Sequence, residues 1–82
     1  MQLGLVIPLL NEHELVTEVV ASIHSTLEAA EISHIIVLVN NGSTDQTGAK
    51  IDDLAQSDSV HAIHLRENAG YGGGILAGFA WL

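Results

Sequence analysis

The stretch Ile35-Ile-Val-Leu-Val39, followed by Asn40-Asn-Gly-Ser-Thr-Asp45, decides the fold of this 82-residue chain. Five consecutive apolar residues, four of them β-branched, predict a strand that is covered on both faces. Strands of this kind belong to parallel sheets, in which helices form the crossover connections. The sequence therefore predicts an α/β fold with residues 35–39 in a parallel sheet.

Two further apolar runs predict the other strands of this sheet. The run Leu3-Gly-Leu-Val-Ile7 comes first, and Pro8 is expected to close it because proline cannot donate a hydrogen bond to a sheet. Residues Val60 to Leu65 form the third candidate strand.

Helical patterns separate the predicted strands. In the first helix, apolar residues recur at every fourth position and form the expected buried stripe: Leu15, Val19, Ile23 and Leu27, with Val16 and Val20 beside them. Asn11 and Glu14 have the spacing of a capping box, so Asn11 is expected to cap this helix.

The other two helices have weaker signals. Ser43 and Gln46 repeat the capping spacing, and the shorter apolar stripe that follows consists of Ile51, Leu54 and Ala55. A glycine-rich loop from Gly70 to Gly74 is expected to lead into a third helix that begins at Ile75.

The order β-α-β-α-β-α predicts a three-layer α/β structure around a three-stranded parallel sheet. Ligands of such sheets bind beyond the carboxyl ends of the strands. Those ends are Pro8–Glu12, Asn40–Asp45 and Arg66–Gly74, where the polar residues and glycines of the chain are concentrated. The sequence therefore predicts a functional edge there.

The charge balance excludes several classes of partner. The formal net charge is −8, and the two basic residues are Lys50 and Arg66. Two cations cannot form the basic surface that nucleic acids or anionic membranes require, so no nucleic-acid partner is expected. Backbone N–H groups at helix starts can still bind a phosphorylated small molecule. The chain has no cysteine, and it has no apolar run long enough for a transmembrane segment. A cytoplasmic location is the resulting expectation.

Each strand-end segment also has a purely structural interpretation. Pro8–Glu12 and Asn40–Asp45 each have the residues of a turn that leads into a capped helix. The segment Gly72-Gly-Gly-Ile-Leu-Ala77 matches the G-x-G-x-x-A pattern of dinucleotide-binding folds, but it follows the third strand rather than the first.

Taken together in this order, the three segments resemble the opening of family 2 glycosyltransferases, a family that includes dolichyl-phosphate mannosyltransferases. The matching residues are Val6-Ile-Pro8 with Asn11-Glu12, then Gly42-Ser-Thr-Asp45, then Glu67-Asn-Ala-Gly-Tyr-Gly-Gly73 running on to Gly78-Phe79. The resemblance covers nearly the whole chain. It implies the N-terminal half of the GT-A fold, which binds nucleotide-diphosphate sugars.

The resemblance also implies a set of site residues and a donor linked to UDP or GDP. The nucleoside end would be lined by Pro8, Leu10, Asn11, Glu12, Asn41, Gly42 and Ser43, and the diphosphate or sugar would lie near Arg66, Gly70, Gly72 and Gly73. Leu10 stands where the family often has an aromatic residue that stacks on the base. Asn41 stands where an aspartate accepts the imide proton of the base, and Asn40 also replaces a common aspartate.

The family's later motifs are not found in these 82 residues. Members carry an Asp-x-Asp metal-binding motif on the next strand and a later carboxylate that acts as catalytic base. The full-length parent is therefore expected to use Mg²⁺ or Mn²⁺, whereas neither a metal ligand nor a catalytic residue can be assigned here. The uncapped apolar end, Phe79-Ala-Trp-Leu82, predicts that the half-domain over residues 1–82 is truncated at its C-terminus. Because the metal motif and the catalytic base are missing, it is expected to be inactive by itself. The parent would transfer a sugar to a polyprenyl phosphate or glycan acceptor, in association with a membrane.

Other interpretations remain open at this point. A non-catalytic α/β module would assemble with a partner or with itself, as a homo-oligomer, through its exposed sheet edge and apolar C-terminus. A dinucleotide-binding fragment is a third alternative. The five histidines suggest no metal site, because no pair of them has convincing ligand spacing.

Overall fold

The computed structural model describes residues 2–82, which alternate between strands and helices as the sequence predicts. The elements are β1 (Gln2–Leu9), α1 (Val16–Ala29), β2 (Ser33–Asn41), α2 (Thr47–Leu54), β3 (Val60–Leu65) and α3 (Gly70–Trp81). The sheet has the order β1-β2-β3, and both pairs of strands are parallel. The predicted three-stranded parallel sheet is confirmed.

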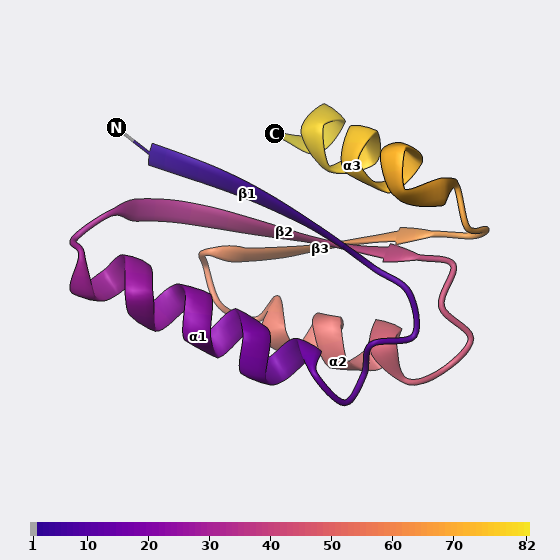
Figure 1. The fold of residues 1–82 in the computed structure, drawn as a ribbon, viewed down its shortest axis with the longest axis horizontal. Helices are drawn as coiled ribbons and strands as arrows, with labels where there is room; N and C mark the ends of the chain where they lie inside the picture. The colour runs from indigo at the N-terminus through magenta and orange to yellow at the C-terminus, as the bar shows by residue number, and fades with distance from the viewer. Residues whose placement is uncertain (1) are drawn as a thin grey trace.

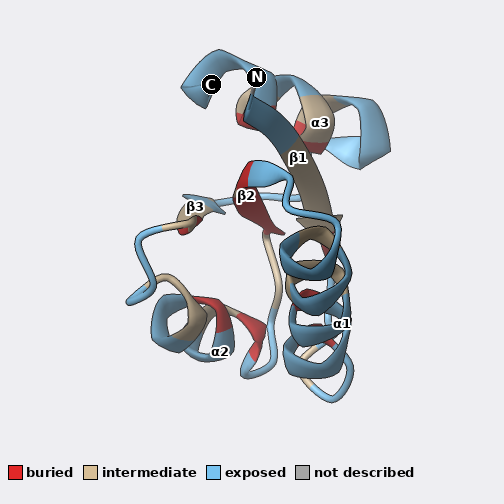
Figure 2. Ribbon diagram, turned by 90° about the vertical axis from the view of Figure 1, so that its left-hand side faces the viewer, coloured by how far each residue is buried: buried red, intermediate tan, exposed pale blue. Residues whose placement is uncertain are grey.

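The helices lie on both faces of the sheet. Helices α1 and α2 cover one face, and α3 covers the other (Figure 1). The resulting three layers confirm the predicted architecture, and they leave β2 buried in the middle (Figure 2). Ile36, Val37, Leu38 and Val39 of β2 have no solvent-exposed surface.

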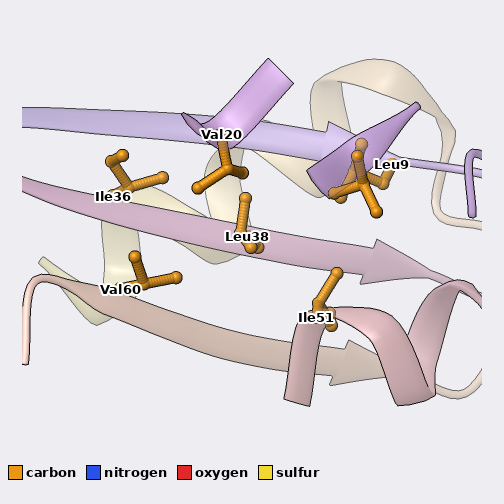
Figure 3. Packing of buried hydrophobic residues seen from close by; sticks show 7 residues of the cluster. Leu9, Val20, Ile36, Leu38, Ile51 and Val60 are labelled. Carbon is orange, nitrogen blue, oxygen red and sulfur yellow. The ribbon is translucent and has the colours of Figure 1, made fainter. Parts of the chain in front are cut away.

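The main core lies between the sheet and the α1/α2 layer. All three strands and the helices α1 and α2 contribute aliphatic side chains to it: Leu9, Val16, Val20, Ile36, Leu38, Ile51 and Val60 (Figure 3). Because side chains alternate along a strand, Val37 and Val39 point to the opposite face. Both faces of β2 are therefore apolar, which is why its sequence is continuously apolar.

The first helix buries only part of the predicted stripe. Val16 and Val20 are buried, whereas Leu15 is 54% exposed and Val19 is 42% exposed. Leu15 lies before the first turn of α1, because the helix begins only at Val16. The loop before α1 thus sets how the helix is turned about its own axis relative to the sheet. Periodicity alone does not give this orientation.

Two predicted boundaries are also wrong. β1 continues through Pro8 to Leu9, and proline is tolerated there because β1 is an edge strand. The glycines from Gly70 onward are not a loop but the first turns of α3.

Glycines let α3 lie close against the sheet. A Cβ atom at Gly78 would lie 2.2 Å from Cγ1 of Val6, and one at Gly74 would lie 3.1 Å from Cβ of Pro8. Gly74 and Gly78 are one turn apart on the same face of α3. Close helix–sheet packing therefore accounts for two glycines of this segment.

Candidate functional site

The carboxyl ends of the three strands meet at one edge of the sheet. Leu9 of β1 pairs with Asn40 of β2, and Asn41 pairs with Leu65 of β3. The three loops that follow these residues therefore start side by side. This juxtaposition is the geometry on which the predicted site depends.

The loops after β1 and β2 are joined by hydrogen bonds that replace the predicted helix caps. The backbone N–H of Asn11 donates to Oγ of Ser43 at 3.1 Å, and the N–H of Thr44 donates to Oδ1 of Asn11 at 2.9 Å. The N–H of Glu12 donates to Oγ1 of Thr47 at 2.9 Å.

The predicted capping boxes are therefore wrong. Neither α1 nor α2 has a side-chain hydrogen bond from its N-cap residue. Asn11 adopts a left-handed conformation with φ of 54°, four residues before the N-cap, which turns its amide toward the loop after β2. Asp45 provides the acceptor for the first N–H of α2, that of Thr47, at 2.8 Å.

Asp45 also joins the two loops through His13. Nδ1 of His13 lies 2.6 Å from Oδ2 of Asp45. Partial removal from water would raise the pKa of Asp45, but hydrogen bonds from the Thr47 hydroxyl, His13 and the Thr47 amide outweigh it. They hold the pKa of this carboxyl well below its usual range, so Asp45 stays ionised wherever the fold is intact near neutral pH.

The side-chain amides of Asn40 and Asn41, at the end of β2, form hydrogen bonds on opposite faces of the sheet. Asn40 faces the α2 side, where its Nδ2 lies 3.1 Å from Nδ1 of His64 and its Oδ1 accepts the N–H of Ser43. Asn41 faces α3, where its Oδ1 accepts the N–H of Ala69 and its Nδ2 donates to the carbonyl of Gly70, both at 2.9 Å. Asn41 thus holds the loop that leads into α3.

Gly42 brings the second loop against the third. Its φ is +76°, a conformation that favours glycine. A Cβ atom there would lie 2.6 Å from the backbone nitrogen of Asn68, so the close approach of the two main chains also requires glycine.

A cavity of about 210 Å³ lies at this edge, between the end of β1 and the start of α3. Four predicted site residues line it, namely Pro8, Leu10, Asn41 and Gly70. Its volume is below the roughly 300–1,000 Å³ of pockets that enclose drug-sized ligands. The cavity has room for a ring the size of a nucleobase rather than for a whole nucleotide sugar.

Three lining residues were not predicted as site residues: Leu9, Asn68 and Tyr71. Asn68 and Tyr71 belong to the matched third segment, and an aromatic residue between glycines was a signal that could have identified Tyr71. Leu9 lies in the predicted strand-end segment Pro8–Glu12, but an aliphatic residue there gave no signal of its own.

The other predicted site residues lie around the cavity rather than in its wall. Asn11, Glu12, Gly42 and Ser43 belong to the joined loops described above. Arg66 is exposed directly after β3, and Gly72 and Gly73 lie in the first turns of α3. Their predicted contacts with a diphosphate or sugar stay a prediction.

The described residues do not provide a set of ligands for a metal ion. Over residues 2–82, no three histidine, aspartate or glutamate side chains converge in a way that could hold one. The divalent cation expected for the full-length parent enzyme stays a prediction. Within the same range, no helix has the length and apolar character needed to cross a bilayer.

Comparison with known proteins identifies the same family as the motifs do. The sequence model of the family described as glycosyl transferase family 2 matches residues 5–82. A polyprenol monophosphomannose synthase from Mycolicibacterium smegmatis is 42% identical over 78 residues, which cover 93% of this chain and 28% of that enzyme. An undecaprenyl-phosphate 4-deoxy-4-formamido-L-arabinose transferase from an Enterobacter species is 31% identical over 81 residues, which cover 96% of this chain and 25% of that enzyme. The chain thus spans about a quarter of the length of these relatives.

Proposed function

Because this chain belongs to glycosyl transferase family 2, we propose that its cavity binds the nucleoside of a UDP- or GDP-linked sugar. The parent enzyme would transfer that sugar to a polyprenyl phosphate or glycan acceptor and would work in association with a membrane. Both relatives carry a polyprenol or polyprenyl phosphate in their names, which supports the lipid acceptor.

The observation that carries the proposal is the composition of the cavity wall. Pro8 and Leu10 come from the end of β1, Asn41 from the end of β2, and Gly70 from the start of α3. Apolar side chains suit the faces of a base, and amide groups suit its edge. In open parallel sheets this edge is where ligands bind.

Binding of the diphosphate relies mainly on the main chain. The chain has two basic residues, Lys50 and Arg66, and only Arg66 is predicted to lie near the diphosphate, so cationic side chains alone cannot neutralise it. The helix α3 begins at Gly70 on the cavity wall, and its first N–H groups carry the positive end of the helix dipole. A diphosphate that leaves the cavity toward α3 would meet these groups.

The proposal makes residues 1–82 a nucleotide-sugar-binding half-domain without catalytic residues of its own. No step of the transfer can be assigned to a metal site in the described residues, because they lack a ligand set. The family match favours this function over a non-catalytic assembly module.

Calorimetric titration of the 82-residue chain with UDP and GDP tests the proposal. We expect saturable binding of at least one of them, without sugar transfer when the corresponding nucleotide sugar is supplied. A stable dimer that ignores both nucleotides and their sugars would contradict the proposal and favour the assembly module. Turnover by this chain would contradict its assignment as a non-catalytic half-domain.

A pair of matched variants locates the binding site. Leu10 and Val19 are both 42% exposed, but only Leu10 lines the cavity. Leu10→Asp removes an apolar side chain from the cavity wall and adds a negative charge beside an anionic ligand, so Kd should rise at least about tenfold. Val19→Asp adds the same charge on α1 and should leave Kd within about twofold. Equal effects of the two variants would place the nucleotide elsewhere.

A further inference from the structure

Tyr71 stands at the mouth of the cavity with most of its surface free. It is the second residue of α3 and lines the cavity, yet it is 75% exposed. Among the described residues that line the cavity, it is the one aromatic side chain. A tyrosine ring at the edge of a cavity offers a large apolar face to a ligand that enters it.

The main chain that carries Tyr71 is held firmly, whereas its ring has room to move. Asn41 binds both Ala69 and Gly70, and Oδ1 of Asn68 accepts the N–H of Gly70 at 2.8 Å. A Cβ atom placed at Gly70 or Gly72 would meet nothing within 4 Å. The backbone before Tyr71 is therefore fixed, and no atom crowds the positions on either side of it.

The rest of the cavity lining combines apolar residues with amides. Pro8 and Leu10 supply apolar side chains, Leu9 also lines the cavity although its side chain lies in the core on the α1/α2 face, and Asn41 and Asn68 supply the amides. A planar heterocycle can lie between the aliphatic wall and a phenol ring, with its polar edge toward the amides. Both polar atoms of the Asn41 side chain already bind the main chain, so each retains capacity for only one further hydrogen bond.

We propose that Tyr71 closes over the nucleobase and stacks on it, so that affinity comes mainly from the face of the base rather than from its edge. This inference rests on the proposed nucleotide-binding function and names the residue that carries it. Stacking discriminates weakly between bases, because every base has a π face. UDP and GDP should therefore bind with affinities within about tenfold of each other, a 1.4 kcal/mol difference.

Substitutions at position 71 separate the ring from its hydroxyl group. Tyr71→Ala should raise Kd for UDP and GDP by about fivefold to a hundredfold, the range measured for loss of one base–aromatic stack. Tyr71→Phe keeps the ring and should stay within about twofold of wild type. Leu76→Ala is the matched control, because Leu76 is 69% exposed on the same helix and does not line the cavity.

Two further measurements separate stacking from a structural role. Tyr71 is the one tyrosine of the chain, so UDP should quench tyrosine emission in a Trp81→Phe background. Adding Leu10→Tyr to Tyr71→Ala places a ring on the opposite wall and should recover at least half of the lost binding free energy.

The outcomes distinguish this inference from the function on which it rests. If wild type binds UDP or GDP and Tyr71→Ala binds equally well, the stacking role is wrong and the proposed function stands. If Tyr71→Phe loses as much affinity as Tyr71→Ala, the hydroxyl group rather than the ring is responsible, and the inference is again wrong. If wild type binds neither nucleotide, both fail.

Discussion

The face of the sheet that α1 and α2 cover is closed by branched aliphatic side chains, whereas the face that α3 covers is closed by glycines. On the first face, Ile51 of α2 and Ile36 and Leu38 of β2 are fully buried among neighbours of similar size. On the second face, Gly74 and Gly78 let the α3 backbone rest almost directly on β1 and the end of β2.

This difference determines which residues line the cavity at the strand ends. Cavities of about 170 and 180 Å³ also lie against the α1/α2 layer, but their walls are mainly aliphatic side chains of the helices and strands. The close approach of α3 instead brings its first residues, Gly70 and Tyr71, beside the carboxyl end of β1 and makes them a wall of the cavity. One face thus supplies stability, and the other positions the candidate site.

The largest effect on stability is expected from truncating a buried aliphatic side chain between the sheet and α2. Ile51→Ala removes a side chain with no exposed surface and should lower the free energy of unfolding by about 2–5 kcal/mol. Urea unfolding followed by circular dichroism measures this loss. A loss below about 1 kcal/mol would show that the face between α2 and β2 is not the principal core.

A smaller effect on stability is expected from adding one methyl group where α3 lies against β1. In Gly78→Ala the new Cβ would lie 2.2 Å from the stiff side chain of Val6, so α3 has to shift. Overpacking costs about 1–3 kcal/mol, which exceeds the roughly 1 kcal/mol that alanine gains over glycine in a helix.

Two controls accompany this variant in the same unfolding experiment. Gly72→Ala adds a methyl group where nothing lies within 4 Å, so it should stabilise the chain by up to about 1 kcal/mol. Val6→Ala combined with Gly78→Ala relieves the contact and should recover part of the loss. Equal effects at positions 72 and 78 would show that α3 does not rest on Val6.

The smallest effect is expected from removing the charge of Asp45, which joins the loops after β1 and β2. Because the pKa of Asp45 is lowered in the folded state, its ionised form stabilises the fold above the ordinary aspartate pKa of about 4. That contribution declines as pH falls below this value toward the folded pKa. Asp45→Asn should therefore be less stable than wild type at pH 7, with a difference that shrinks by pH 3.

Urea unfolding at the two pH values measures the difference. Asp53→Asn is the control, because Asp53 is an exposed aspartate on α2. A stability difference between Asp45→Asn and wild type that is the same at pH 7 and pH 3 would contradict the role of the Asp45 charge.

The fold could be predicted because its signals are local. The run from Ile35 to Val39 is apolar at every position, and only a strand between two helical layers buries both of its faces. Proline in an edge strand and glycines inside a helix displaced boundaries without changing the order of the elements. The predicted stripe of α1 included Leu15 and Val19, which are exposed, because periodicity does not show which edge of an apolar face lies against the sheet.

The candidate site could be predicted only in part. Pro8, Leu10, Asn41 and Gly70 were expected at the strand ends and do line one cavity. The capping roles given to Asn11 and Ser43 were wrong, because each of these residues bonds to the other's loop rather than to its own helix.

By itself, the sequence determined the order of strands and helices, the buried parallel sheet and the three segments that lie at its carboxyl edge. These depend on apolar periodicity and turn residues, which act over a few neighbouring positions. Only the tertiary structure decided what the polar groups of those segments bind and where Tyr71 stands. The partners of Asn11 and Asn41 lie 28 to 33 residues away along the chain, and such bonds can form only after parallel pairing has brought the loops together.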